Sequence, residues 1–593
     1  MKLKNFFNDL NLNMEDKYYI IFIAFFSILI TLMMVKFHQT RGAFNSDIYV
    51  YLASAADYAG MNYGHMSDLS YMSNSPLICY LTSLLFKIGF VDINSIFLVT
   101  SLFSISGIFA MYIFLKIRFS NLLSLIGALL YSSFSLTLFY FANGMLDVPA
   151  VAMILWTLIF TVAAANKNPK YYLVVAVFFA MSFFTRYTTI YIISLIALYI
   201  LKDYDLINLL ECFFYSRKEF KQKIVTFFKS YEFKLMFISL AIGFAIVLFV
   251  FYTIASYNAP ISYFNNAAAS INSVYSTLDP NFITDKFFYI KNYLSLLFAS
   301  EITSPKQIEK FTNPSIMVFL ILAIFFLGFL IKFITIIKNK EFYIGNIEKI
   351  PFRSSKSESV LKISIPIFFV LAVISFKLSY LYSVFLLWVI LIIVQSLIKK
   401  YSSVNQDMFS LSLVCFGLFS FYIVIFSFID LKCVRYVLPT LPAFAYFVIY
   451  ALEKILNFIK YGWEDKNAGS KNIKSKFRLR VSQFISIILI VLLLFTAFNF
   501  TTTVEIDELS LNFDHASNFL LDYDSDYQSK EIGANVGDRY YEWYFKKNVD
   551  LIDTNNFNSS DYDYVFVYYD LNNDDYHEIY HDGIIGVYER NQI

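Results

Sequence analysis

Residues 18–37 read Y-Y-I-I-F-I-A-F-F-S-I-L-I-T-L-M-M-V-K-F and indicate the class of fold expected for this chain. The single charge in this run, on Lys36, lies near its end. A helix needs about 20 predominantly apolar residues to cross the hydrocarbon core of a bilayer. The run lacks the small-residue cleavage site of a signal peptide, so it is predicted to remain in the protein as a first membrane helix.

The same pattern recurs along the chain. Of its 593 residues, 58% are hydrophobic and 16% are charged, whereas a soluble domain carries about a quarter charged residues. Arg186 and Lys377 interrupt two of the apolar regions, which are therefore predicted to be tight hairpins. Thirteen segments are predicted to span the membrane: 18–37, 93–115, 121–141, 148–165, 171–185, 187–201, 235–256, 314–337, 360–376, 379–398, 408–429, 436–452 and 481–498.

Basic residues predict the orientation of these helices. The connecting segments 202–234, 338–362 and 453–480 contain seven, six and eight Lys or Arg residues. Short loops rich in Lys and Arg stay in the cytoplasm. The N-terminus is therefore predicted to be cytoplasmic, and thirteen crossings place the C-terminus outside the cell membrane.

Two units are expected from this arrangement. Residues 1–499 form the predicted membrane domain, with outer loops at 38–92 and 257–313. Residues 500–593 hold 20 Asp or Glu against 5 Lys or Arg and form a predicted extracytoplasmic α/β domain. The α/β character is suggested by an amphipathic stretch at 514–523, a run I-G-A-N-V at 532–536, a helical segment at 538–547 and strands at 564–569 and 584–588. The expected fold is thus an α-helical polytopic membrane protein with a small C-terminal α/β domain.

Charged residues at the outer ends of the predicted helices are the candidate functional groups. No Asp or Glu lies in the middle of a predicted span, which disfavours an ion-coupled transporter. Asp47 follows the first span, and Asp147 precedes the fourth in N-G-M-L-D-V-P. Because an Arg fork can bind two phosphate oxygens at once, outer cations near these acids suggest an anion site. The outer cations are Arg186, Lys377, Lys432 and Arg435.

Each candidate also has a structural interpretation. Asp47, after Ser46, fits a helix N-cap, and Asp147 beside Pro149 fits the first turn of a helix. The outer cations individually fit interfacial residues whose charge reaches water. The four cysteines lie far apart without a C-x-x-C pair, so they are interpreted as apolar residues rather than as metal ligands or disulfides.

Several motifs follow one another in a definite order. An acid soon after the first span is followed by Y-x-S-x-S-P-L (Tyr71 to Leu77), then by L-D-V-P, T-R-Y-T and R-Y-V-L-P-T-L-P (Arg435 to Pro442). This order resembles the GT-C glycosyltransferases, in particular the protein O-mannosyltransferase and lipid A aminoarabinose transferase group. The resemblance covers roughly residues 1–460. Asp47 is followed by Ile48 rather than by a second acid, which is closer to the aminoarabinose branch. No W-W-D motif of oligosaccharyltransferases is present.

This resemblance implies that a sugar is transferred from a polyprenyl or dolichyl phosphate to an acceptor hydroxyl on the outer face, with inversion. It implies that Asp47 is the catalytic base and that Arg186, Lys377, Lys432 and Arg435 bind the lipid phosphate. For Asp147 it implies either a divalent metal, Mg²⁺ or Mn²⁺, or the positioning of the acceptor. Tyr71, Ser73 and Asn74 are expected to line the sugar pocket.

The expected partners are the lipid bilayer, the lipid-linked sugar donor and a glycan, protein or lipid acceptor, and no nucleic acid is expected. Two other functions remain open from the sequence. A lipid-linked sugar flippase or transporter would use the outer cations to bind a head group. A non-catalytic membrane sensor would bind a ligand with its acidic outer domain.

Overall fold

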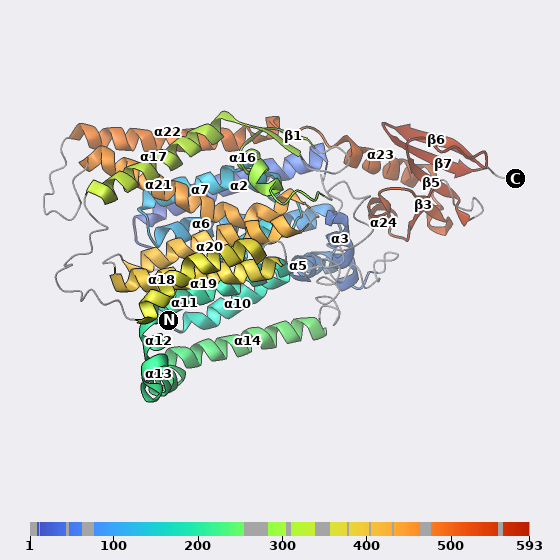
Figure 1. The fold of residues 1–593 in the computed structure, drawn as a ribbon. Coiled ribbons are helices and arrows are strands. Elements are labelled where there is room, and N and C mark those ends of the chain that lie inside the picture. Colours follow the sequence, from blue (N-terminus) through green and yellow to red (C-terminus); the bar gives the residue numbers. More distant parts are fainter. Residues whose placement is uncertain are drawn as a thin grey trace.

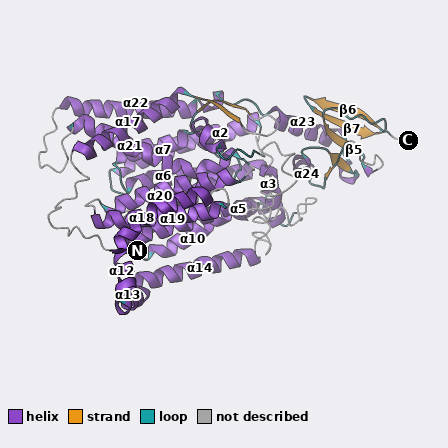
Figure 2. Cartoon of the chain, in the orientation of Figure 1, coloured by secondary structure: helices purple, strands orange, loops and turns teal. Residues whose placement is uncertain are grey.

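The chain forms a helical bundle with a small β-sheet beyond one end of it (Figures 1 and 2). In this computed structural model the bundle helices run roughly along a common direction, and the sheet belongs to the C-terminal part of the chain. The structure describes residues 9–10, 12–42, 47–61, 76–204, 206–253, 283–303, 310–338, 356–375, 379–401, 405–429, 432–462, 476–554 and 561–591.

Nine helical segments within the described residues are long and apolar enough to cross a membrane. Together with the exposed apolar surface described below, they support a multi-pass membrane protein. They are α2 (Asp16–Arg41), α6 (Ile93–Lys116), α9 (Asp147–Asn166), α14 (Tyr231–Thr253), α17 (Ile316–Lys338), α19 (Tyr380–Tyr401), α20 (Gln406–Phe428), the 3₁₀ turn η7 (Val434–Thr440) continued by α21 (Leu441–Tyr461), and α22 (Lys476–Phe498).

Shorter helices lie in the remaining predicted spans and in the segment 38–92, which is predicted to be an outer loop. Four of them, α5, α7, α10 and α18, are also apolar, and the predicted total of thirteen crossings stays a prediction. The shorter elements before the C-terminal region are α3 (Asp47–Tyr58), α5 (Pro76–Lys87), α7 (Asn121–Ser133), α8 (Ser135–Phe139), α10 (Tyr171–Thr185), η2 (Tyr187–Tyr191), α11 (Ile192–Ile200), η3 (Leu201–Asp203), α12 (Leu206–Tyr215), α13 (Arg217–Lys229), α16 (Phe288–Leu297), β1 (Ala299–Thr303), β2 (Lys310–Pro314) and α18 (Lys356–Ser375).

One predicted span, 121–141, is not a single helix. It breaks at Phe134, which is fully buried and has extended backbone angles between α7 and α8. The hydroxyl of Ser135 then accepts a hydrogen bond of 3.0 Å from the backbone N–H of Ala299, at the start of β1. The break therefore joins this part of the bundle to the β1–β2 hairpin, a tertiary contact that the apolar pattern alone does not encode.

Burial separates central from peripheral helices. In the most apolar 18-residue stretch of α9, 89% of the sequence is buried inside the protein, whereas in the corresponding stretch of α14 only 6% is buried. Phe237, Phe244 and Phe249 of α14 expose 62–64% of their surface. A row of exposed large apolar side chains is stable against lipid tails rather than against water. Helix α14 thus presents the surface expected of a lipid-facing helix.

Close helix crossings use small residues. A Cβ atom placed on Gly328 of α17 would lie 2.3 Å from the carbonyl oxygen of Ala451 on α21. The two backbones can approach so closely only because Gly328 has no side chain, which is typical of helix packing in membranes.

The C-terminal elements form a mixed sheet with helices beside it. The strand order is β4-β3-β5-β7-β6, in which β3 pairs in parallel with β4 and β5 and the other pairs are antiparallel. The aromatic rings of Phe513, Tyr541 and Phe566 form part of its core. The elements are η8 (Phe500–Thr502), α23 (Glu508–Tyr523), η9 (Tyr527–Ser529), β3 (Ile532–Ala534), α24 (Asp538–Phe545), β4 (Asp550–Leu551), β5 (Tyr564–Tyr568), β6 (Tyr576–Asp582) and β7 (Ile585–Arg590).

The predicted α/β character of this tail is confirmed, and strands β4 and β6 were not predicted. Strand β6 reads Y-H-E-I-Y-H-D. Most of these residues are polar, so the segment lacks the apolar pattern by which a strand is recognised in a sequence. The sheet and the basic helix α13 lie at opposite ends of the bundle (Figure 1). Their assignment to the exterior and the cytoplasm, and the domain boundary near residue 500, stay predictions.

Candidate active site

Asp47 lies at the first position of α3, on the end of the bundle that carries the C-terminal sheet. Its Oδ2 atom accepts a hydrogen bond of 2.7 Å from Nη2 of Arg435, which belongs to η7. The two residues are 388 positions apart. The structure therefore brings together two of the residues that the sequence singled out, and it forms a charge-assisted contact between them.

Arg435 keeps unused hydrogen-bonding capacity. Its Nε and Nη1 atoms are buried and have no hydrogen-bond partner among the described residues. Its side chain is only 12% exposed, so these donors are shielded from water. A buried donor without an acceptor is costly, and a cation in this state favours an anionic ligand that fills the vacant positions.

A second acid–base pair lies beside the first. Oδ1 of Asp147, at the start of α9, is 2.7 Å from Nη1 of Arg186, and both side chains are largely buried. Arg186 follows the last residue of α10 and has an extended backbone. Its guanidinium lies over the ring of Tyr436, 5.4 Å from the centroid. Because Tyr436 adjoins Arg435, the two pairs form one cluster of two carboxylates and two guanidinium groups.

The ionisation of Asp47 follows from its neighbours. Burial is the largest single influence on the pKa of Asp47 and raises it, whereas the positive charge of Arg435 and the hydrogen bond from it lower it. The charges of Arg539 and Arg186 act in the same direction, and the pKa of this carboxyl lies below its ordinary value. Asp47 is therefore a carboxylate at neutral pH, which is the form that can accept a proton.

Lys432 lies in a different environment from Arg435. Its side chain is buried, and its ammonium donates hydrogen bonds to the carbonyls of Phe426, Ser427 and Ile429 at the C-terminal end of α20. A cation at this position satisfies carbonyls that the helix leaves unpaired and matches the helix dipole. The arrangement favours a structural role for Lys432, and its predicted binding of phosphate stays a prediction.

The remaining predicted site residues lie outside the described residues. They are Lys377, between α18 and α19 in the sequence, and Tyr71, Ser73 and Asn74, between α3 and α5.

The described residues of the cluster do not suit a divalent metal in this arrangement. Mg²⁺ prefers near-octahedral coordination by oxygen atoms. Asp147 offers one buried oxygen, Oδ2, that has no hydrogen-bond partner among the described residues. However, the charges of Asp47 and Asp147 are balanced by Arg435 and Arg186. The predicted metal stays a prediction, and no catalytic step below uses it.

Arg539 was missed by sequence analysis. It is one of the five basic residues of the acidic tail, and nothing in its local sequence links it to Asp47, almost 500 residues earlier. The aromatic neighbours Tyr540 and Tyr544 of α24, which pack on Tyr49 of α3, were also not predicted. Only the tertiary contact between these two helices brings this part of the tail to the site.

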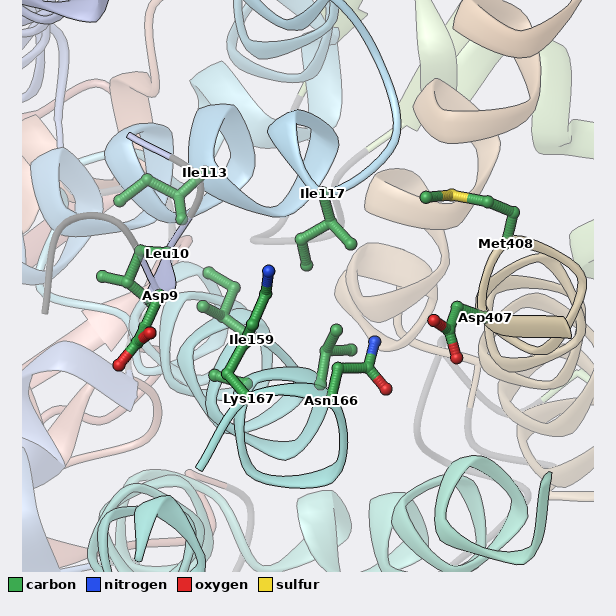
Figure 3. Close-up of a pocket in the computed structure, with 11 residues that line it drawn as sticks. Asp9, Leu10, Ile113, Ile117, Ile159, Asn166, Lys167, Asp407 and Met408 are labelled. Atoms are coloured by element: carbon green, nitrogen blue, oxygen red, sulfur yellow. The ribbon is translucent and has the colours of Figure 1, made fainter. Parts of the chain in front are cut away.

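A cavity of about 270 Å³ lies at the other end of the bundle (Figure 3). It is lined by the C-terminal ends of α6 and α9 and by the start of α20, and the side chain of Lys167 extends into it. Asp407 on its wall is 2.6 Å from the ammonium of Lys202. The cavity is therefore remote from Asp47 and Asp147, and the chemistry proposed below does not involve it.

Comparison with known proteins supports the predicted resemblance. A protein family described as dolichyl-phosphate-mannose-protein mannosyltransferase matches residues 73–210. The matched region contains Asp147 and Arg186 and ends before η7, which carries Arg435. The similarity to the GT-C group that the motifs predicted is confirmed by this match. No curated protein sequence matches the chain.

Solved structures with a related arrangement share little sequence with this chain. The archaeal oligosaccharyltransferase AglB from Archaeoglobus fulgidus, in complex with an inhibitory peptide and a dolichol-phosphate, has 10% identity and a TM-score of 0.46, covering 94% of this chain and 70% of its own. ArnT from Cupriavidus metallidurans, bound to undecaprenyl phosphate, has 11% identity and a TM-score of 0.45, covering 96% of this chain and 98% of its own.

Proposed function

We propose that this protein is a membrane glycosyltransferase that transfers a sugar from a polyprenyl or dolichyl phosphate to an acceptor hydroxyl at the outer membrane face. The contact between Asp47 and Arg435, which leaves two buried guanidinium donors unused, carries this conclusion. A carboxylate base and a cation for a leaving phosphate are the two groups that the reaction needs. The family match over residues 73–210 supports the same class of reaction.

Arg435 binds the phosphate of the donor in this mechanism. Its Nε and Nη1 atoms donate to phosphate oxygens, and Arg186 provides a second positive charge nearby. As the bond between the anomeric carbon and the phosphate oxygen breaks, negative charge develops on the phosphate. Guanidinium groups held in a water-poor site stabilise that charge without having to reorganise.

Asp47 acts as the general base. It accepts the proton of the acceptor hydroxyl as the hydroxyl oxygen bonds to the anomeric carbon from the side opposite the phosphate. The phosphate leaves with the electron pair of the broken bond, and the configuration at the anomeric carbon inverts. Asp47 then returns its proton to water. Binding of phosphate to Arg435 offsets part of the positive charge near Asp47, which strengthens Asp47 as a base.

Sugar transfer by the full-length protein in detergent micelles tests this function. The native protein is supplied with a panel of polyprenyl phosphate sugars and compared with Asp47→Asn and Arg435→Ala. Asp407→Asn is a matched control, because it removes a salt-bridged carboxylate at the opposite end of the bundle. We expect donor turnover by the native and control proteins and its loss in the two site variants.

The opposite result identifies a different function. If no donor is consumed, and the native and Asp47→Asn proteins bind the lipids equally well, then sugar transfer is wrong for this panel and lipid translocation becomes the better interpretation. If the lipids do not bind to the native protein either, a non-catalytic sensor is favoured.

A further inference from the structure

Helix α24 of the C-terminal region packs directly on helix α3, which begins with Asp47. The rings of Tyr540 and Tyr49 lie 4.1 Å apart between centroids, and both side chains are fully buried. A second contact joins Trp543 to Phe86 of α5, with a centroid distance of 5.9 Å. Aromatic contacts of this size bury large apolar areas and fix the relative position of the helices.

This packing brings Arg539 close to Asp47. Arg539 immediately precedes Tyr540, and Asp47 lies two residues before the Tyr49 on which Tyr540 packs. In agreement with this position, the charge of Arg539 lowers the pKa of Asp47 more than the charge of Arg186 does. The side chain of Arg539 is exposed, whereas Arg435 and Arg186 are largely buried.

The location of Arg539 at the start of its helix is unfavourable for a cation. It lies in the first turn of α24, which begins at Asp538. The positive end of the helix dipole disfavours a cation there. The charge of Arg539 lowers the pKa of Glu542 within α24 and also that of Asp47, which lies outside α24.

We propose that Arg539 is a third cation of the phosphate site, supplied by the C-terminal region from the water side of Asp47. This inference rests on the proposed function and extends it. Arg435 and Arg186 hold the donor phosphate from within the bundle, and Arg539 attracts and contacts the same phosphate from the opposite, solvent-exposed side. The C-terminal region is then part of the substrate site rather than a separate accessory domain.

Direct binding of a polyprenyl phosphate to the full-length protein in micelles tests this role. The variants are Arg539→Gln and Arg539→Lys, with Arg435→Ala as the reference for loss of the site. Lys530→Gln is the matched control, since it removes one positive charge at the other end of β3 from α24. Affinity is measured at several salt concentrations, because an exposed cation contributes a salt-dependent attraction.

We expect Arg539→Gln to weaken binding about two- to fivefold at low salt, the size expected for an exposed charge pair, and to reduce the salt dependence. Arg539→Lys should retain most of the affinity, and Lys530→Gln should match the native protein. Native affinity and native salt dependence in Arg539→Gln would overturn the role of Arg539. If Arg435→Ala still loses binding in that case, the proposed function survives; if the native protein binds no polyprenyl phosphate, both proposals are wrong.

Discussion

Asp47 and Arg435 are separated by 388 positions in the chain and form a contact of 2.7 Å between Oδ2 and Nη2. The contact joins the first turn of α3 to the 3₁₀ turn η7, which leads into α21. Arg435 is not saturated by this contact, because its Nε and Nη1 atoms are buried without hydrogen-bond partners among the described residues. In the proposed mechanism these two donors bind the phosphate of a substrate while Nη2 remains in contact with Asp47.

The second pair, Asp147 and Arg186, should contribute to stability as well as to function. In Asp147→Asn, the charge of Arg186 stays largely buried without its counter-charge, and loss of one partner of a buried pair costs about 3–5 kcal/mol. We expect a clear decrease in the thermal unfolding temperature in detergent. The double variant Asp147→Asn with Arg186→Met should recover most of the stability and none of the sugar transfer. No decrease in the single variant would show that the pair is accessible to water.

Replacement of Lys432 by Met tests whether this residue stabilises the end of α20 or binds the lipid phosphate. The change removes the donor that serves three carbonyls at the end of α20, and buried unpaired carbonyls cost about 1–3 kcal/mol each at most. We therefore expect lower thermal stability and an unchanged affinity for polyprenyl phosphate. A large loss of affinity with native stability would instead support the phosphate-binding role predicted from the sequence.

Docking of α24 should be needed for transfer. Tyr540 is fully buried against Tyr49, and truncation of a large buried aromatic side chain costs about 3–5 kcal/mol. We expect Tyr540→Ala to increase cleavage of the C-terminal region in limited proteolysis and to reduce transfer, although Asp47 and Arg435 are unchanged. The control is Tyr523→Ala, because half of the Tyr523 surface is exposed. Equal cleavage of the Tyr540→Ala and Tyr523→Ala variants would contradict the prediction that Tyr540 holds α24 against α3.

The C-terminal region should lose stability as pH rises through the acidic range. Burial raises the pKa of Glu542 from 4.5 to about 7, and the negative charge of Asp538 acts in the same direction. The backbone N–H of Val549 and the charge of Arg539 oppose this shift, and the charge of Asp550 adds to it. The folded state therefore binds a proton that the unfolded chain has already released, so stability falls between about pH 4.5 and pH 7.

The full difference in pKa corresponds to roughly 3 kcal/mol. Unfolding of the native protein, followed by the fluorescence of Trp543 and the other tryptophans from pH 4.5 to 8, measures this loss. In Glu542→Gln the side chain cannot ionise, and the pH dependence in this range should become flatter. An identical slope in the native and variant proteins would show that other groups determine it.

The sequence by itself determined the class of fold and most of the helices. Apolar runs are local features, and a bilayer requires the same length from each of them wherever they occur. The run at 18–37 therefore predicts α2, and the continuous aromatic and β-branched run at 564–569 predicts β5. The order of the motifs also identified Asp47, Asp147, Arg186 and Arg435 as residues of interest.

Only the tertiary structure decided how these residues pair and which of them lie apart. Asp47 contacts Arg435, Asp147 contacts Arg186, and Lys432 donates hydrogen bonds to carbonyls at the end of α20. These contacts depend on how helices pack, and several of them join segments hundreds of residues apart. No local sequence pattern encodes such packing. The same reason applies to the break at Phe134 and to the placement of Arg539, because each follows from a contact with a distant part of the chain.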